Sequence, residues 1–448
     1  MKGINKGLSI FAINLILAFL GLEAVSLGFY FAQEKQLFYT RENTTSKVRE
    51  NLEKTGTRLG AGFDDQSIIE RLHPFFAYVL EPGAFTQEES GLKVNNYGFF
   101  SLHDYPFVKT QKNQFIVGVF GGSVANDFAL NSIVNEARGN EGFIQYLKNI
   151  PQLKDKEIVV LSFAGGGYKQ PQQLLILNYF LSIRQEFDLV INIDGFNEVA
   201  LSNLNNQAQV ELALPSIQHI QPLTGLANND LSVMKAIVEI SELKNKLLTA
   251  INQLESCKLA LCHSFRSLQV KQFLDSYQKE VNEYDQKIAR KSNKIGGSDS
   301  LVYFTKMPTV LEDAVAFEKM TEIWYDSSLT MNQILSSRNI PYVQFIQPNQ
   351  YYPTKRVFTE EEKFIFVENH PYAEGVQKGY PVLLSKVNDL QKQNINVFNA
   401  VNILDNEKST VYRDACCHYN MIGETILEKY IANSIESVIV EGGRRETP

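Results

Sequence analysis

Short apolar runs that end in glycine or a small polar residue recur along the chain, and this pattern limits the possible fold more than any other feature. Four runs are typical of buried strands and are followed by helical patterns: residues 115–120, 158–162, 189–193 and 342–346. Val397 lies in a fifth candidate. Strands that alternate with helices form a mostly parallel sheet covered on both faces. The pattern predicts an α/β fold with sites at the carboxyl ends of the strands.

The alternation stops over residues 199–340, which we interpret as a helical insertion between two parts of one domain, residues 110–198 and 341–440. Apolar residues recur at steps of three and four over residues 240–254 and 273–288, without proline. This predicts two or more long helices. Packing of the two helices on each other explains the pattern, and self-association as a coiled coil is the alternative. The insertion is expected to be a lid or an interaction arm.

An almost wholly apolar segment lies near the start of the chain. Residues 8–31 would form a helix about 36 Å long, enough to cross a hydrocarbon core of about 30 Å. Lys2 and Lys6 precede this segment, so the positive-inside rule leaves the N-terminus in the cytoplasm. Glu23 is costly inside a bilayer, and residues 24–26 resemble a weak signal-peptidase site. We expect a single-pass anchor and a periplasmic or extracellular domain, with a cleaved signal peptide as the alternative.

Residues 34–109 separate the anchor, residues 1–33, from the first predicted strand of the sheet. The polar and charged first half of this region is typical of a membrane-proximal linker. Residues 73–78 and 95–99 are rich in aromatic side chains. This density predicts that the second half packs against the main domain.

Charge and cysteine content exclude some functions. A formal net charge of −7 and a pI of about 5.6 imply no basic surface for a phosphate backbone, so nucleic acid is not an expected partner. Cys257, Cys262, Cys416 and Cys417 lack the paired CxxC spacing of a structural zinc site, so we expect no metal and no cofactor. In an exported protein the cysteines can be oxidised, although the adjacent pair is poorly placed to form a bridge.

Two candidate site residues lie in glycine-rich turns. Ser123, in Gly-Gly-Ser, follows the first strand and begins a helix, where backbone N–H groups favour developing negative charge and so suit a nucleophile. The same tripeptide at residues 296–298 follows no strand and is typical of a flexible turn. Gly167 ends a run of three glycines after the second strand. Such a turn can point a peptide N–H into a site or can be only a tight turn.

Polar residues mark two further segments. Asn197 follows the third strand, where its amide can donate to an oxyanion or form part of an ordinary turn or helix cap. Asp414 and His418 lie in a loop ahead of the last predicted helix, residues 424–438. A histidine oriented by a carboxylate is the base that a serine hydroxyl needs. The other five histidines lack an acidic partner in a loop placed this way.

In this order, the four segments resemble the SGNH (GDSL-type) hydrolase superfamily. Ser123 matches the block I serine, Gly167 the block II glycine, Asn197 the block III asparagine and His418 the block V histidine. The resemblance implies a three-layer α/β/α, flavodoxin-like fold. It also implies a triad of Ser123, His418 and Asp414, and an oxyanion hole formed by Ser123, Gly167 and Asn197.

The segments depart from the family pattern at four points. Block I has Gly122 where aspartate is usual, block II has Ser162 in place of asparagine, and block III ends in Glu198 rather than aspartate. In block V, three residues instead of two separate Asp414 from His418. The motif serine, glycine, asparagine and histidine are all present.

The resemblance implies a serine esterase that acts through an acyl-enzyme on ester-linked acyl groups of a carbohydrate or lipid. Members of this superfamily that are tethered to a membrane and face outward resemble enzymes that add or remove acetyl groups on polysaccharides. An O-acetyltransferase is therefore the first alternative, and a catalytically silent envelope scaffold is the second. Gln347 and Asn349 follow the fourth strand and are expected to line the substrate groove, with a surface loop as the alternative.

Overall fold

The computed structural model describes seven segments of the chain: residues 2–34, 37–40, 70–87, 90–227, 231–292, 302–366 and 370–445. Most of the predicted linker and the Gly-Gly-Ser tripeptide at 296–298 lie outside these residues. The contacts divide the chain into two compact units. The smaller unit comprises Met1–Leu59 and Asn229–Lys294, and the larger comprises Gly60–Asn228 and Ile295–Pro448.

A five-stranded parallel sheet forms the centre of the larger unit. Its strands are β6 (Gln114–Gly121), β7 (Glu157–Ser162), β8 (Leu189–Asp194), β9 (Tyr342–Ile346) and β10 (Asn396–Asn399). Their order is β10-β9-β8-β6-β7, and all neighbours are parallel. In chain order this is 2-1-3-4-5, the order of flavodoxin-like doubly wound sheets. The predicted α/β class and all five strand positions are confirmed.

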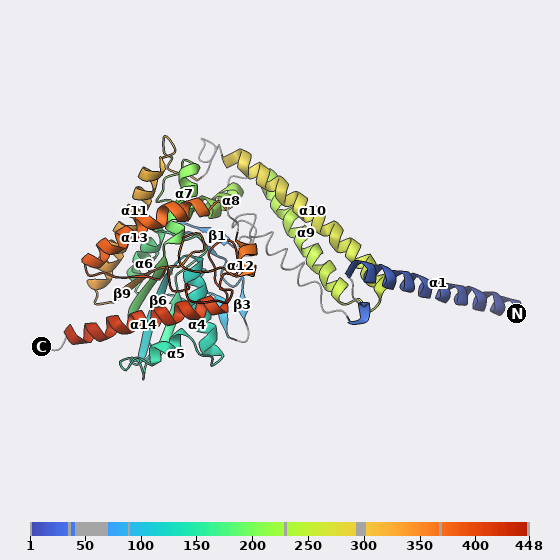
Figure 1. The fold of residues 1–448 in the computed structure, drawn as a ribbon, viewed down its shortest axis with the longest axis horizontal. Helices are drawn as coiled ribbons and strands as arrows, with labels where there is room; N and C mark the ends of the chain where they lie inside the picture. The colour runs from blue at the N-terminus through green and yellow to red at the C-terminus, as the bar shows by residue number, and fades with distance from the viewer. Residues whose placement is uncertain are drawn as a thin grey trace. The chain divides into compact units, whose positions relative to one another are not determined.

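Helices cover both faces of this sheet (Figure 1). On one face lie α4 (Ser123–Ala137), α5 (Phe143–Lys148) and α14 (Met421–Arg445). On the other lie α6 (Gln172–Ser182), α7 (Phe196–Gln207), α11 (Asp313–Ser336) and α13 (Ala373–Lys392). Two shorter helices, α8 (Ile217–Ala227) and α12 (Glu360–Ile365), complete the unit within the described residues. The apolar strands are therefore buried on both sides, which explains why they are continuous apolar runs.

Two small antiparallel sheets precede the central one. The first pairs β1 (Glu70–His73) with β2 (Ala77–Leu80), and the second contains β3 (Thr86–Gln87), β4 (Leu92–Val94) and β5 (Phe100–Ser101). Phe76 and Phe99 are buried in the same core as the central strands. The aromatic segments therefore pack against the main domain, as predicted.

Part of the region predicted as an insertion belongs to the larger unit. Helix α11 packs on α13 and carries Trp324, which is fully buried and donates from Nε1 to Asp194 Oδ2 at 3.0 Å. Helix α7 begins two residues after β8. The part of the predicted 199–340 segment that falls in the smaller unit is Asn229–Lys294.

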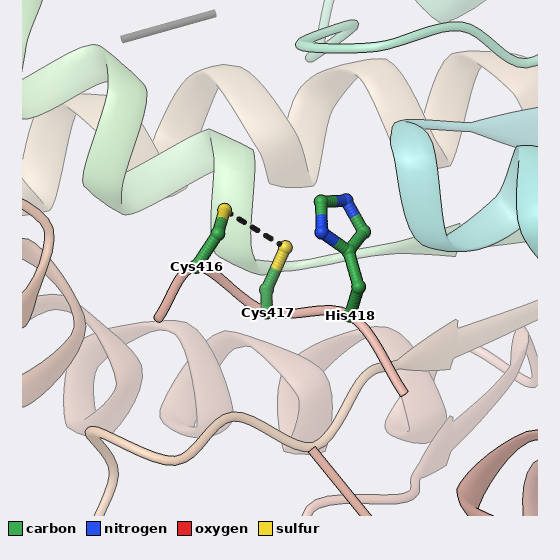
Figure 2. A group of neighbouring side chains, drawn as sticks. All are labelled: Cys416, Cys417 and His418. Atoms are coloured by element: carbon green, nitrogen blue, oxygen red, sulfur yellow. Dashed lines mark hydrogen bonds between the residues drawn. The ribbon is translucent and has the colours of Figure 1, made fainter. Parts of the chain in front are cut away.

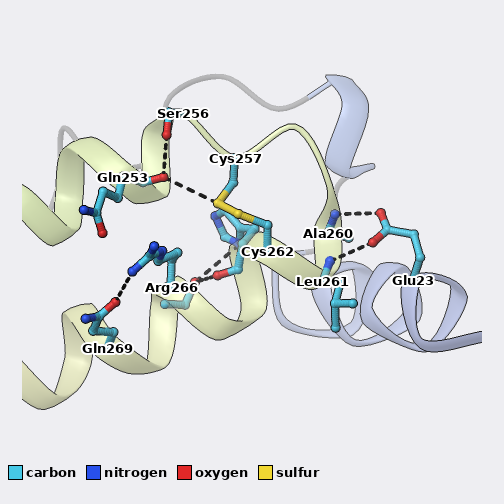
Figure 3. Close-up of a disulfide and its surroundings, with 11 residues drawn as sticks. Glu23, Gln253, Ser256, Cys257, Ala260, Leu261, Cys262, Arg266 and Gln269 are labelled. Atoms are coloured by element: carbon cyan, nitrogen blue, oxygen red, sulfur yellow. Dashed lines mark hydrogen bonds between the residues drawn. A yellow bond between two sulfur atoms is a disulfide. The ribbon is translucent and has the colours of Figure 1, made fainter. Parts of the chain in front are cut away.

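The smaller unit contains α1 (Lys2–Glu34), the 3₁₀ turn η1 (Phe38–Thr40), α9 (Leu231–Glu255) and α10 (Ala260–Ser292). Helices α9 and α10 form a hairpin in which the periodic apolar residues are buried: Ile240, Leu247, Ile251, Leu254, Tyr277, Val281 and Tyr284. The two predicted long helices are thus confirmed. A Cys257–Cys262 disulfide closes the turn between them (Figure 3).

Helix α1 contains a strongly apolar segment, Ile13–Ala32, with a mean hydropathy of 2.0. Among the described residues, it is the one helix long and apolar enough to cross a membrane, a property that signal sequences share. Most of its side chains from Phe11 to Phe31 are exposed.

Candidate active site

Ser123 is the first residue of α4 and follows β6 after a turn of two glycines. Gly121 has a φ of +139°, and a Cβ there would lie 2.1 Å from the Ile193 carbonyl oxygen. A Cβ at Gly122 would lie 2.1 Å from Asn197 Nδ2. An aspartate at position 122, the residue that the family resemblance leads us to expect, therefore has no room beside Asn197. The turn places the Ser123 hydroxyl at a helix N-terminus, where the first N–H groups have no helical partner.

Three side chains from two distant segments form one chain of hydrogen bonds. Ser123 Oγ lies 2.7 Å from His418 Nε2, and His418 Nδ1 lies 2.5 Å from Asp414 Oδ2. The His418 and Asp414 side chains are 19% and 18% exposed, so the chain of bonds is shielded but still accessible. A hydroxyl, an imidazole and a carboxylate in this order can move a proton from the serine to the ring nitrogen.

The His418 loop is closed by its own hydrogen bonds. Tyr412 and Tyr419 form an antiparallel bridge, the Arg413 N–H donates to the His418 carbonyl at 3.1 Å, and the Asn420 N–H donates to the Val411 carbonyl at 2.7 Å. Residues 414–417 form the tip of this loop. The three residues between Asp414 and His418 are accommodated there.

Asp414 uses both carboxylate oxygens. Oδ1 accepts the N–H groups of Cys416 at 2.9 Å and Cys417 at 3.2 Å, while Oδ2 faces His418. The same side chain thus folds the loop tip and orients the imidazole. Burial raises the pKa of Asp414, but the charge and hydrogen bond of His418 outweigh it and hold that pKa well below its usual value.

Neighbouring segments fix the position of this loop. Arg413 Nη2 donates to Asp127 Oδ2 at 2.7 Å, which ties the loop to the helix that begins at Ser123. Gln350 Nε2 donates to the Asp414 carbonyl at 3.0 Å, and Asn349 Nδ2 donates to the Cys416 carbonyl at 3.4 Å. The loop is therefore held from two sides.

Two free thiols lie beside the imidazole (Figure 2). Cys416 Sγ and Cys417 Sγ are 3.3 Å apart and unbridged. Burial raises the pKa of the Cys417 thiol, but the hydrogen bond from Cys416 and the charge of His418 outweigh it and bring the pKa to about 6. Burial lowers the pKa of His418, but Cys417 and Asp414 together raise it well above its usual value.

These thiols and His418 are also donor types that zinc favours, and their donor atoms lie within 4.8 Å of one another. Both ring nitrogens of His418, however, already bond to Asp414 and Ser123. A metal at this point would take the imidazole out of the chain of hydrogen bonds.

We expect the acid limb of the pH profile of kcat/KM to lie above pH 6.5, because a base must be neutral and His418 is held protonated by its neighbours. Cys417→Ser removes a negative neighbour, so the imidazolium is less stabilised and the limb should move to lower pH. Cys416→Ser keeps a hydroxyl donor beside Cys417 and should move the limb less. A profile unchanged in Cys417→Ser would contradict this electrostatic coupling.

Two further loops meet the turn that precedes Ser123. The Gly165 N–H donates to the Gly121 carbonyl at 3.3 Å, and Asn197 Nδ2 donates to the Tyr168 carbonyl at 2.8 Å. An amide nitrogen carries two hydrogens, so Asn197 keeps one for another acceptor. Within the described residues, the Gly167 N–H makes no hydrogen bond to a protein group. Gly167 and Asn197, two of the predicted oxyanion donors, thus lie in the two loops that contact the turn before Ser123.

Gly167 cannot be replaced without displacing a histidine. Its φ is +69°, and a Cβ would lie 2.2 Å from Cδ2 of the His219 ring. His219 stacks on Tyr78 and lies 3.4 Å from Glu70 through Nδ1. Strand β1 brings Glu70 to His219 from 149 residues away, so this histidine has an acidic neighbour, although not one in a loop like that of His418. No short-range pattern indicates this contact.

Glu198 is a positioning residue that the sequence interpretation treated only as a departure from the motif. It is 2% exposed, and its carboxylate accepts the N–H of Gly195 at 2.7 Å and of Gln170 at 3.1 Å. It therefore joins the turn before Asn197 to the loop that follows Gly167. Its position three residues after Gly195, from which a glutamate can accept the N–H of the residue that precedes a helix, is the signal that could have identified this role.

The residues predicted to bind substrate lie in different surroundings. Asn349 lines a pocket of about 230 Å³ together with Gln350, Tyr352 and Tyr412. Gln347 is 4% exposed, is not among the residues lining this pocket, and its Nε2 has no hydrogen-bond partner within the described residues. The loop from Gln347 to Tyr352 also supports the His418 loop, through the hydrogen bonds that Asn349 and Gln350 donate to it.

No protein-family model matches the chain, and no curated protein sequence matches it. Among solved structures, the chain is similar to the crystal structure of a "putative acylhydrolase" from Bacteroides fragilis, with 9% sequence identity and a TM-score of 0.33. The match covers 74% of this chain and 89% of that one.

Proposed function

We propose that the protein is a serine ester hydrolase of the SGNH type, with Ser123, His418 and Asp414 as its triad. One observation carries this proposal: the continuous chain of hydrogen bonds from Ser123 Oγ through His418 to Asp414. Its place in the fold adds support. Ser123 and Asn197 follow neighbouring parallel strands, at the edge of the sheet where α/β proteins form their sites.

In the proposed reaction, His418 Nε2 takes the hydroxyl proton as Ser123 Oγ attacks the ester carbonyl. Asp414 stabilises the imidazolium that forms. The imidazolium then gives its proton to the leaving alcohol, and an acyl-enzyme remains on Ser123. Water, deprotonated by His418, releases the acyl group as a carboxylic acid.

The oxyanion of the tetrahedral intermediate would be bound by the N–H groups of Ser123 and Gly167 and by the remaining amide hydrogen of Asn197. Such donors act strongly because they are fixed before charge develops. Here the Gly121–Gly122 turn, the Glu198 carboxylate and the His219 ring hold the three segments that carry them.

Asn197→Ala is expected to slow turnover about 10²-fold or more, because loss of one oxyanion donor typically costs about 2.7 to 4 kcal/mol of transition-state stabilisation. The effect should fall on kcat rather than KM. Asn203→Ala on the same helix is a control for general damage to α7. Undiminished kcat in Asn197→Ala would remove this residue from the oxyanion hole.

The proposed substrates are ester-linked acyl groups of a carbohydrate or lipid outside the cytoplasm. Lys2 and Lys6 precede the apolar segment of α1, so the positive-inside rule leaves the short leading segment in the cytoplasm. The sheet domain would then act on the other side of the membrane. Its substrates would be components of a bacterial envelope.

A fluorophosphonate probe tests the function directly, since it phosphonylates only an activated serine. We expect labelling of the full-length protein in detergent, with the adduct on the peptide that contains Ser123. His418→Ala should suppress the labelling because the hydroxyl loses its base. An unlabelled wild-type protein that is folded by circular dichroism would favour the silent scaffold instead.

A further inference from the structure

Helix α1 has one carboxylate in its apolar stretch, and that carboxylate caps another helix. Glu23 Oε1 accepts the Ala260 N–H at 2.7 Å, and Oε2 accepts the Leu261 N–H at 2.8 Å (Figure 3). Glu23 is 8% exposed. A helix N-terminus, with its unpaired N–H groups and positive dipole end, is a favourable partner for an anion. The cap explains how an apolar helix accommodates a glutamate.

The turn that precedes α10 is held in place for this contact. The Cys257–Cys262 disulfide joins the end of α9 to the first turn of α10 and encloses the two capped residues. Tyr39 of η1 also donates to Glu23 Oε1 at 3.2 Å. Two segments of the smaller unit, the first turn of α10 and η1, therefore converge on one carboxylate in α1.

The depth of Glu23 follows from placing Lys6 at the inner boundary of the hydrocarbon, where its charge stays in water. A helix needs about 20 residues to cross about 30 Å of hydrocarbon. Counted from Gly7, just after Lys6, such a span ends at Ser26. Glu23 then lies about 5 Å inside the outer end of the span. The first turn of α10, bonded to Glu23, must lie at the same depth.

The hairpin tip, residues 257–268, exposes apolar side chains, as a segment just inside the outer boundary of the hydrocarbon must. Leu259, Phe265 and Leu268 are 39%, 69% and 69% exposed. Nearby in the same unit, Leu37 and Tyr39 are 62% and 65% exposed. Apolar side chains are stable in the outer layer of a bilayer and costly in water. In Figure 1, α10 runs from its contact with α1 away from the N-terminal half of α1.

We propose that the hairpin tip is a lipid-binding element, inserted beside α1 into the outer interfacial layer of the bilayer. The occupant of its exposed apolar surface is lipid, because Phe265 and Leu268 lie on the helix whose first turn is bonded to α1, and the side chains of α1 are themselves apolar and exposed. Lys258, exposed at the tip, can extend its ammonium to the phosphate headgroups. Helix α1 is then a retained anchor, since cleavage after residue 26 would remove the Glu23 cap.

Tryptophan quenching in nanodiscs of brominated phosphatidylcholine tests the proposal on the full chain. The natural Trp324 is buried in the larger unit and gives a constant background. We expect brominated lipid to quench the added emission of Phe265→Trp at least twofold. Gln278→Trp, exposed about 20 Å further along α10, should be quenched little. Equal and weak quenching at both positions would overturn the proposal.

A third variant separates the tip from the anchor. Leu15→Trp lies in the exposed part of α1 and should be quenched strongly. Quenching at position 15 without quenching at 265 would show that the tip contacts something other than lipid, such as a second copy or a partner protein. No quenching at either position, or an intact mass that begins after residue 26, would overturn the retained anchor and the proposal with it. None of these results depends on esterase activity.

Discussion

Turnover of p-nitrophenyl acetate should fall about 10⁴-fold or more when Ser123 is replaced by alanine, because no acyl-enzyme can form without the hydroxyl. The variant should fold normally, since within the described residues Ser123 Oγ hydrogen-bonds only to His418. The measurement is p-nitrophenol release by the full-length protein in detergent.

The second Gly-Gly-Ser tripeptide of the chain provides the matched control for this variant. Ser298→Ala changes the same local sequence, and it should leave turnover unchanged because the sequence predicts no strand before that serine. Wild-type turnover in Ser123→Ala would place the nucleophile elsewhere and remove the triad. Turnover absent from the wild type as well would direct attention to an acyltransferase with a demanding acceptor or to the silent scaffold.

Asp414→Asn is expected to lower kcat about 10⁴-fold while the loop stays folded. An asparagine oxygen can still accept the N–H groups of Cys416 and Cys417, so the turn survives. Its amide at the position of Oδ2, however, donates to His418 Nδ1 and favours the wrong tautomer. The neutral side chain also no longer stabilises the imidazolium.

The Asp414 variant is judged by kcat together with the melting temperature. Asp389→Asn, which removes an exposed carboxylate that pairs with Lys392 on α13, is the control and should leave kcat unchanged. A melting temperature close to that of the wild type, with a large fall in kcat, supports an orienting role. A kcat within a few-fold of the wild type would show that His418 works without this carboxylate.

Much of the fold was predictable because its strands and long helices each require a recognisable pattern of apolar residues in the local sequence. Strands buried on both faces must be continuous apolar runs, and the two hairpin helices must repeat apolar residues at three- and four-residue steps. The contact of Glu23 with Ala260 joins residues 237 apart, and no local sequence pattern indicates it. The pairing of Cys257 with Cys262 was also left open, because spacing alone does not show whether two thiols face each other.

The candidate site was predictable only where a residue stands in a local motif. Ser123 and His418 could be singled out from their own segments, whereas the geometry of Asp414 depends on hydrogen bonds that close its loop. The contact of Glu70 with His219 arises from chain segments that meet only after folding. Gln347 and Asn349 remain predicted substrate residues, and the structure adds that their segment supports the His418 loop.

The proposed base, His418, and its proposed orienting acid, Asp414, lie in one loop that begins and ends at the bridge between Tyr412 and Tyr419. The interval between Asp414 and His418 is therefore set by how the tip of that loop folds, not by the chemistry of proton transfer. Insertions and deletions at the tip can be tolerated during evolution as long as the two ends stay paired. Distant relatives should then be sought by the paired ends, because a fixed number of intervening residues would miss them.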